Sequence, residues 1–315
     1  MNRRGSVLSF LLVAFMLFVP IAYSFAQQDD QSITLGVSPQ ILDITANPGE
    51  SFTNTFRLTN GSKESLSIEA TPKNFTPRGE EGAVNITEED TGYSLAKWTT
   101  VSPKTTIIEA GKTIDFKATI DVPENAEAGS HFGSIVFKTL PPAQPAATTA
   151  VSQEIAPVIL VRISGDIRES AEIIEFKTNQ SLYSNQSKVV LTSRIKNTGN
   201  VHFKPSGKIT IKDMFNKEVA SMDIDQRNIL PETIRQFTNE WSTNGVKIGK
   251  YTATLTVVYG SDNNIQTSST SFTFFPYQII IPAFLIIVLV IFVIVKFRSR
   301  ISLALKVLSG KDNKG

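Results

Sequence analysis

An uncharged apolar segment near the carboxyl end constrains this chain more than any other sequence feature. It runs from about Phe274 to Val295, and its centre, Ile279 to Val295, contains no charged residue. At a rise of ~1.5 Å per residue, about 20 such residues cross the ~30 Å hydrocarbon core of a bilayer. The alternative, a buried core helix of a soluble domain, fits poorly because the run is apolar on every side. The segment 274–295 therefore predicts a transmembrane helix.

The basic residues after this segment predict its orientation. Positive charges lie directly beyond its end, at Lys296, Arg298, Arg300 and Lys306. Because Lys and Arg favour the cytoplasmic side of a membrane, residues 296–315 are expected to form a basic cytoplasmic tail. Residues 27 to about 276 are then expected to lie outside the cell. The predicted localisation is a cell membrane crossed once.

The amino terminus has the pattern of a secretory signal. Arg3 and Arg4 precede an apolar run from about Val7 to Val19, and Ser24-Phe25-Ala26 then places small residues where a signal peptidase reads them. Residues 1–26 are therefore predicted to be a signal peptide that is cut after Ala26. The alternative is an uncleaved anchor helix, for which the run is short.

The charge between these two ends limits the class of partner. The chain has 31 Lys and Arg against 29 Asp and Glu. Setting aside the eight basic residues and one acidic residue of the two ends leaves 23 basic against 28 acidic residues, a net charge of about −5. Phosphate contacts need clustered basic side chains, so we expect no nucleic acid partner. The absence of cysteine excludes thiol catalysis and thiolate metal sites.

Short alternating segments between residues 27 and 273 predict an all-β fold. In Ser51–Thr59, for example, Phe52, Phe56 and Leu58 fall on one face. Such segments recur every 8 to 15 residues and end at Asn, Gly, Pro or Ser, which is typical of antiparallel strands. No stretch has the spacing of a long amphipathic helix. The sequence therefore predicts two tandem immunoglobulin-like β-sandwich domains followed by a single transmembrane helix.

The two halves of this region share an order of landmarks. An Asn-containing turn ends a strand at Asn60 and again at Asn197, and a Gly-x-aromatic sequence opens a late strand at Gly129 and again at Gly249. This order is expected of duplicated domains. We predict a first sandwich over residues 27–164, a second over 165–273, the membrane helix over 274–295 and the tail over 296–315.

Two segments of the first domain are candidate contact surfaces. The first is the Pro-rich stretch Leu140–Thr149, which we interpret as a long loop inside the domain because Ile155–Ile163 supplies a strand that the sandwich still needs. Its candidate binding residues are Pro141, Pro142 and Pro145. The second is the stretch Lys73–Asp90, which we expect to be rich in loops, with candidate residues Lys73, Asn74 and Arg78.

Catalytic groups are sparse. The only two histidines, His131 and His202, lie beside a glycine and a proline respectively, so each is expected to be an exposed loop residue. A serine triad would need one of them to meet a serine and a carboxylate from elsewhere, and no spacing indicates this. Trp98 and Trp241 are expected to pack in the cores, although a surface tryptophan could stack on sugar rings. We predict no catalytic residue, no metal site and no cofactor.

The layout resembles that of the WxL-interacting surface proteins of bacteria. The motifs that carry the resemblance are Asn47-Pro48-Gly49-Glu50, the segment Val122–Gly133 and Gly249-Lys250-Tyr251. Ser130-His131 departs from the glycine that members of this family tend to have there. The resemblance implies a peptidoglycan-binding immunoglobulin-like domain followed by a second such domain. The opening of the chain also resembles the amino-terminal half of periplasmic pilus chaperones, although it lacks a clear pair of basic residues for a subunit's terminal carboxylate.

These features together predict a non-enzymatic, membrane-anchored extracellular protein for binding or adhesion. Its expected partner is a cell-wall polymer or another surface protein. One alternative is a structural or accessory subunit of a membrane complex, in which the span packs against partner helices. The other is a hydrolase of wall polysaccharide, which would need two carboxylates about 5 to 10 Å apart in a pocket.

Overall fold

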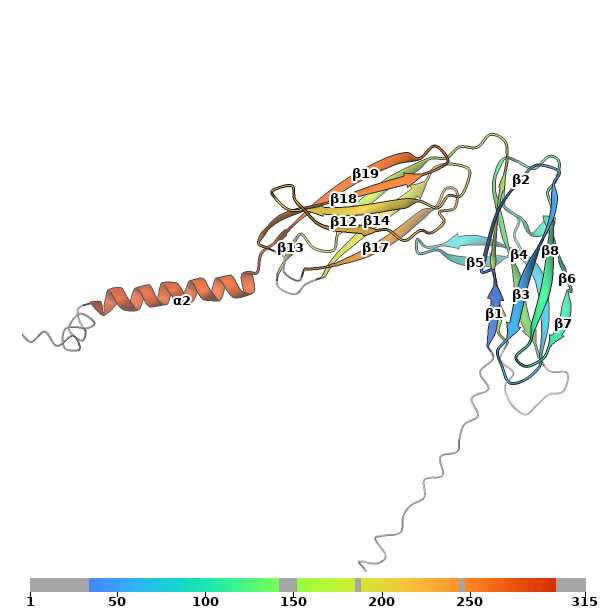
Figure 1. Cartoon of the computed structure of the whole chain (residues 1–315), viewed down its shortest axis with the longest axis horizontal. Coiled ribbons are helices and arrows are strands. Elements are labelled where there is room, and N and C mark those ends of the chain that lie inside the picture. The colour runs from blue at the N-terminus through green and yellow to red at the C-terminus, as the bar shows by residue number, and fades with distance from the viewer. Residues whose placement is uncertain (1–33, 142–151, 185–187, 244–246, 299–315) are drawn as a thin grey trace, which may run out of the picture.

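The computed structural model describes residues 34–141, 152–184, 188–243 and 247–298. These residues form two β-sandwiches and one long apolar helix, which confirms the predicted all-β immunoglobulin-like class (Figure 1). The predicted signal peptide and most of the predicted tail lie outside the described residues.

The first sandwich packs two sheets face to face. The smaller sheet has the order β1-β3-β8-β6 and the larger β2-β11-β9-β4-β5, with β10 beside β9 and β7 beside β4. Strand β2 runs parallel to β11, whereas the other pairs of this sandwich are antiparallel. A single-turn 3-10 helix, η1, precedes β6. The bounds are β1 Leu35–Ser38, β2 Ile41–Ala46, β3 Ser51–Asn60, β4 Leu66–Arg78, β5 Ala83–Thr87, η1 Ala96–Trp98, β6 Thr99–Ser102, β7 Thr105–Ile108, β8 Thr113–Asp121, β9 Gly129–Leu140, β10 Glu154–Ile155 and β11 Val158–Ile163.

Alternation of apolar and polar residues accounts for this packing. In β3 the side chains of Phe56 and Leu58 are fully buried while their neighbours are exposed. Phe116 of β8 and Phe137 of β9 meet edge to face across the core, with ring centroids 4.8 Å apart. The period of two that predicted the strands thus also selects the side chains that fill the space between the sheets.

The stretch Lys73–Asp90 is not the loop-rich segment that the sequence predicted. Lys73 to Arg78 form the second half of β4, which turns at residues 79–82 and returns as β5 in an antiparallel hairpin. Strand β4 contains Pro72 and Pro77, and proline is a residue that usually interrupts strands. Within the predicted segment, only the turn at residues 79–82 and residues 88–90 lack strand structure.

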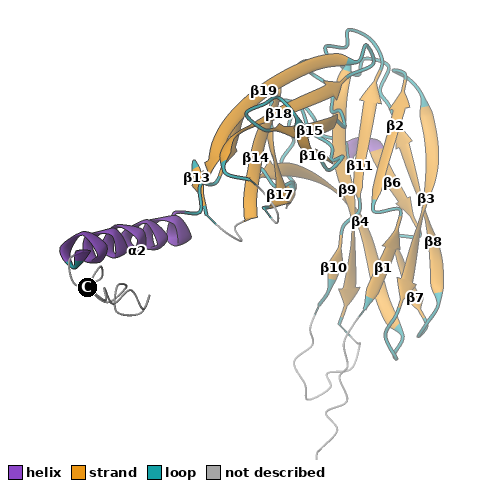
Figure 2. Ribbon diagram, turned by 60° about the vertical axis from the view of Figure 1, so that its left-hand side comes forward, coloured by secondary structure: helices purple, strands orange, loops and turns teal. Residues whose placement is uncertain are grey.

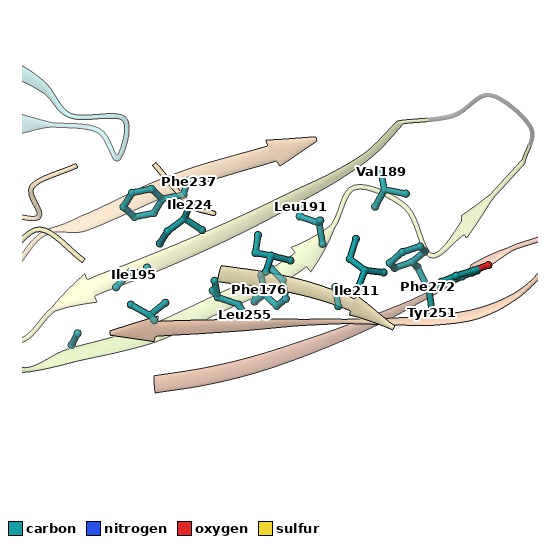
Figure 3. Close-up of a cluster of buried hydrophobic side chains, with 14 of the residues drawn as sticks. Phe176, Val189, Leu191, Ile195, Ile211, Ile224, Phe237, Tyr251, Leu255 and Phe272 are labelled. Atoms are coloured by element: carbon teal, nitrogen blue, oxygen red, sulfur yellow. The ribbon is translucent and has the colours of Figure 1, made fainter. Parts of the chain in front are cut away.

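The second sandwich is built on the same principle. One sheet has the order β12-β14-β17 and the other β13-β19-β18-β15-β16. The bounds are β12 Ala171–Thr178, β13 Leu182–Tyr183, β14 Lys188–Asn197, β15 Ser206–Lys212, β16 Glu218–Asp223, β17 Ile234–Ser242, β18 Gly249–Tyr259 and β19 Asn264–Phe274. Side chains from both sheets interdigitate between them, among them Leu191, Phe237 and Leu255 (Figure 3). Trp241 packs against this core and Trp98 against the first one, as expected.

The structure supports the repeated order of landmarks with matching hydrogen bonds. Asn60 is fully buried, and its Nδ2 donates to the carbonyl oxygens of Glu64 (2.7 Å) and Ile108 (2.9 Å). Asn197 is also fully buried, and its Nδ2 donates to the carbonyl oxygens of Val201 (2.7 Å) and Ile229 (3.0 Å). In each domain the asparagine therefore joins its own turn to the corner that precedes the next long strand.

The Gly-x-aromatic landmark is repeated as well. The Tyr251 hydroxyl donates to the carbonyl oxygen of Lys247 at 2.7 Å, four residues earlier. His131 occupies the matching place, with Nε2 3.0 Å from the carbonyl oxygen of Glu127, again four residues earlier. His131 is 5% exposed and packs against Trp98, with ring centroids 4.4 Å apart, so its prediction as an exposed loop residue was wrong.

Helix α2, Tyr277–Lys296, leaves the second sandwich at the end remote from the first (Figure 1). None of its residues is buried, and its stretch from Ile279 to Val295 contains no charged residue. The two sandwiches lie across one another, so the strand-rich part of the molecule is bent (Figures 1 and 2). The described residues thus form two sandwiches at an angle to one another, followed by a helix that is long and apolar enough to cross a membrane.

Candidate functional site

At the junction between the two sandwiches, buried polar groups connect residues that are far apart in the sequence. Its centre is His202, which follows the Asn197 turn of the second sandwich. The His202 ring is 2.6 Å from Ser130 Oγ through Nδ1 and 2.9 Å from Asp43 Oδ1 through Nε2. Ser130 belongs to β9 and Asp43 to β2, so one side chain of the second domain binds two strands of the first.

With a neutral imidazole ring, His202 can form all three of its hydrogen bonds to Ser130 and Asp43. Ser130 Oγ accepts the backbone N–H of His202 at 2.6 Å, which leaves its own hydroxyl hydrogen free to donate to Nδ1. Nε2–H then donates to the Asp43 carboxylate. His202 is 5% exposed, so its prediction as an exposed loop residue was wrong as well. The partner Asp43 lies 159 positions away in the sequence, and no local spacing could indicate it.

Serine, histidine and aspartate thus meet, but in an arrangement unsuited to nucleophilic catalysis. A nucleophile must reach a substrate, and Ser130 is 1% exposed. Its oxygen is occupied by two hydrogen bonds to His202. The exposed member is the carboxylate, because half of the Asp43 side-chain surface is open to solvent. The three residues hold the domains together.

The pKa of Asp43 lies below its ordinary value. The main cause is the hydrogen bond from His202, which is opposed by partial burial and reinforced by Asn228 and Arg162. Asn228 Nδ2 reaches Asp43 Oδ2 at 3.3 Å from the second domain. The carboxylate is therefore the form that the junction favours.

Backbone contacts bring the two domains close beside this network. The backbone N–H of Ser130 donates to the carbonyl oxygen of Asn200 at 2.9 Å. Gly129 permits this approach, because a Cβ there would lie 2.7 Å from the same oxygen and because its φ is +130°. Asn200 also accepts the backbone N–H of Arg168 on Oδ1 and donates to the Asp166 carbonyl from Nδ2. It therefore fastens the connecting segment to both domains.

The β4–β5 hairpin makes the second polar contact across the junction. Its turn reaches the β14–β17 sheet, as Figure 1 shows. Arg194 donates two hydrogen bonds to the Glu80 carboxylate, from Nε to Oε2 at 2.7 Å and from Nη2 to Oε1 at 2.5 Å. The Gln236 backbone N–H donates to the Glu80 carbonyl at 2.8 Å. The Arg194 hydrogen bond lowers the pKa of Glu80. The Arg235 guanidinium lies against Gly82, where a Cβ would overlap it.

An apolar cluster fills the space between these polar contacts. Phe132 of β9 stacks on Phe75 and Tyr93, with ring centroids 4.9 and 5.3 Å apart. Leu160 is buried with them, and Leu230 of the second domain packs against the group. Strand β9 is therefore buried on both faces, one toward its own core and one toward the second domain. The junction is consequently a packed interface, and the space left in it is a hollow of about 40 Å³ beside Leu230 and Arg235.

The connecting segment is held by an ion pair on the other side of the junction. Arg162, in the last strand of the first sandwich, pairs with Glu169. Ser261, in the β18–β19 turn, donates to Glu169 Oε2 from its backbone N–H (2.6 Å) and its hydroxyl (2.7 Å). Burial alone would raise the pKa of Glu169, but the Ser261 and Arg162 hydrogen bonds outweigh it and lower that pKa. An open hollow of about 380 Å³ lies beside these residues.

The predicted binding residues fall in different environments. Asn74 is buried, and its side chain bonds to the backbone of Glu89, Leu95 and Ala96, which gives it a structural role. Lys73 pairs with Glu88 and is half-buried. Arg78 and Pro141 are exposed. Pro142 and Pro145 lie outside the described residues. No cluster of three or more His, Cys, Asp or Glu residues suited to a metal occurs among the described residues.

Comparison with known proteins returns structural likeness alone. No family model and no curated protein matches the chain. The chain is similar to the class 5 fimbriae chaperone CfaA at 14% identity and a TM-score of 0.39, covering 77% of this chain and 100% of that one. It is similar to the CsuC–CsuE chaperone–tip subunit complex of Acinetobacter baumannii at 13% identity and a TM-score of 0.37, covering 77% and 99%.

A third similar structure is a single domain. It is PapD-like domain 7 of human CEP192, at 13% identity and a TM-score of 0.30, covering 44% of this chain and 91% of that one. At these values the fold assignment rests on the strand pairing and the two cores of the chain itself.

Proposed function

We propose that this chain is a membrane-anchored binding protein that holds two sandwiches outside the membrane without catalysing a reaction. The observation that carries the proposal is α2. Its 20 residues span about 30 Å, have no buried member and contain no acidic residue. A helix that is apolar on every side and has no residue buried by the described part of the chain is suited to a lipid environment.

The orientation follows from charge. Lys296 and Arg298 stand at the carboxyl end of α2, and Arg300 and Lys306 follow in the sequence. The other end carries Tyr277, an exposed residue of the aromatic type that favours the membrane–water interface. Both sandwiches then lie on the extracytoplasmic side, and the predicted signal peptide 1–26 would send them there.

The packed junction supports a binding role rather than a catalytic one. It fixes the first sandwich at an angle to the second through buried contacts at His202 and Phe132 and a partly exposed ion pair at Glu80. A first domain held away from the membrane by a rigid second domain is suited to reaching a partner. In line with the resemblance to WxL-interacting proteins, we propose a cell-wall polymer or another surface protein as that partner.

The free end of the first sandwich is the proposed contact surface. The β4–β5 hairpin is engaged in the junction, and Asn74 is buried, so Lys73 and Asn74 are poor candidates for contact. Strand β9 meets the second sandwich near its first residues and ends at Leu140, which pairs with Ser67. The segment 141–149 therefore follows the end of β9 that is remote from the junction. We therefore place the contact at 141–149, and Arg78 is a second exposed candidate.

Retention on cell walls tests this proposal. The full chain in detergent micelles is mixed with purified bacterial cell walls, either with their surface proteins or stripped of them, and the bound fraction is measured by sedimentation. We expect retention on at least one preparation. Replacing 141–149 by a Gly-Ser segment of equal length should lower it, whereas Glu81→Gln, an exposed change in the hairpin turn, should not. Equal retention of all variants would refute the contact surface, and no retention on either preparation would refute the proposed partners.

A further inference from the structure

The end of the second sandwich next to α2 exposes a group of large apolar side chains. Their exposed fractions range from 46% to 83%, and Phe215 has the highest. We call this group the apolar tip; it consists of Leu182, Met214, Phe215 and Ile248. In the described part of the second sandwich, the other exposed large apolar residues are Val219, near the same end, and Ile265, at the opposite end.

Strand register places the tip residues at one level of the fold. Leu182 pairs with Thr273, directly before the last residue of β19. β15 ends at Lys212, which pairs with Thr252. The turn that holds Met214 and Phe215 therefore extends beyond this pair, toward the end of the sandwich next to α2. Ile248 precedes Gly249, which pairs with Phe274. The Met214 methyl group lies over Gly249, where a Cβ would overlap it.

The turn that carries Phe215 is held by its own hydrogen bonds. Asp213 Oδ1 accepts the backbone N–H groups of Phe215 (2.9 Å) and Lys217 (3.0 Å). The Asp213 N–H donates to the Lys217 carbonyl at 2.9 Å, and the Asn216 N–H donates to the Asp213 carbonyl at 2.9 Å. The fold therefore presents an aromatic ring to its surroundings on a fixed turn, at a place where solvent exposure is unfavourable.

The connection to α2 keeps this surface close to the bilayer. Only Phe275 and Pro276 separate the end of β19 from the start of α2. Two extended residues span at most about 7 Å, which is comparable to the ~5–8 Å of headgroup region on each side of the hydrocarbon core. The Phe275 N–H also donates to the Tyr183 carbonyl at 2.8 Å, which fastens the connection to the sandwich. The end of the sandwich cannot move far from the membrane surface.

The charges around the tip suit lipid headgroups. Four lysines lie in or beside the same strand ends and turns: Lys212, Lys217, Lys247 and Lys250. The acidic residues there are Asp213, whose Oδ1 is used within the turn, and Glu218. Apolar and aromatic side chains ringed by lysines are typical of surfaces that lie in the membrane interface, where the lysine amines reach anionic headgroups.

From these observations we infer that the apolar tip is a second membrane contact, which inserts into the headgroup region of the bilayer that α2 crosses. The inference rests on the proposed role of α2 as a membrane span. Its occupant is lipid, because the short connection brings lipid to this surface in any complex the chain forms. The contact would fix the tilt of the second sandwich and, through the packed junction, the direction in which the first sandwich points.

Depth-dependent quenching tests the inference on the full chain. Because the chain has no cysteine, a single cysteine can be introduced and labelled with an environment-sensitive dye. Three variants are reconstituted separately into vesicles of equal parts phosphatidylcholine and phosphatidylglycerol: Phe215→Cys at the tip, Ile265→Cys as an exposed control at the opposite end, and Leu289→Cys within α2. Each is measured with and without lipids that carry a spin-label quencher near the headgroup.

We expect the dye at 215 to lose about half of its emission to the quenching lipid, since an interfacial dye contacts the label. The dye at 265 should keep its emission. If 289 is shielded from water while 215 behaves like 265, the tip contact is refuted although α2 spans the bilayer. A blue shift at 215 without quenching would mean that protein covers the tip, which also refutes the inference. If 289 itself is exposed to water, the span fails, and the inference fails with it.

Discussion

The hydrogen bonds between Ser130 and His202 allow the junction to be tested by one small substitution. Ser130→Ala removes an oxygen that accepts the His202 N–H and meets His202 Nδ1, both at 2.6 Å. The site is nearly closed to water, because Ser130 is 1% and His202 5% exposed. Leaving a buried polar group without a partner costs about 1–3 kcal/mol. Two such groups predict a loss of about 2–6 kcal/mol in unfolding free energy.

A matched control lies four residues further along the same strand. Ser134 is also buried, but its Oγ donates to the Pro157 carbonyl within the first sandwich at 2.7 Å. Ser134→Ala removes a similar hydroxyl without touching the second sandwich, and should cost about 1–2 kcal/mol in the first sandwich alone. The comparison separates the loss of a buried hydroxyl from the loss of a contact between domains.

Urea unfolding of the full chain in detergent micelles measures both effects. The chain has two tryptophans, Trp98 in the first sandwich and Trp241 in the second, so Trp→Phe backgrounds let each domain report alone. The contacts between the domains break when the first of the two domains unfolds. The free energy measured for that first transition therefore includes the contribution of the junction. The double variant of Ser130→Ala and His202→Ala should cost less than the sum of the single variants by at least about 1 kcal/mol. Additive costs, within about 0.5 kcal/mol, would refute the role of this contact.

Three further outcomes follow from the same structure. The pKa of Asp43 is lowered in the folded state, so its contribution is present above the unfolded value of ~3.9 and is lost as pH falls through the lower folded value; Asp43→Asn should flatten the pH dependence of the urea midpoint below pH ~4, and an unchanged dependence would contradict the assignment. Asn60→Ala and Asn197→Ala should each destabilise their own sandwich by about 2–4 kcal/mol in urea unfolding, because two carbonyls lose a buried donor, and a loss below about 1 kcal/mol would argue against the shared corner. Phe132→Ala should cost about 3–5 kcal/mol in the same assay, because its ring fills the cluster between the domains. A much smaller loss would contradict the close packing of that cluster.

The sequence predicted the sheets well because burial on one face produces a period of two. β3, β8 and β18 follow that period, and their inward residues form the cores. The apolar span was predictable because composition alone distinguishes a segment that is apolar on every side. Asn60 and Asn197 could be paired from the shared order, although their common hydrogen bonds required the structure.

The junction escaped prediction because its contacts join residues far apart in the sequence. His131 and His202 were interpreted as loop residues from the glycine and proline beside them, yet both are buried. One signal was present: Gly129–Phe137 lacks the polar alternation of a half-exposed strand. A strand of this kind is buried on both faces, and this pattern could have indicated that something covers the outer face of β9.

Protease treatment of intact cells tests the central claim most directly. The full chain is expressed with one epitope after Gly315, and the cells are exposed to protease before and after lysis. We expect protease to remove both sandwiches from intact cells and to leave a short tagged fragment with α2 and the tail. Sandwiches that survive on intact cells and are digested only after lysis, or an epitope lost before lysis, would contradict the claim.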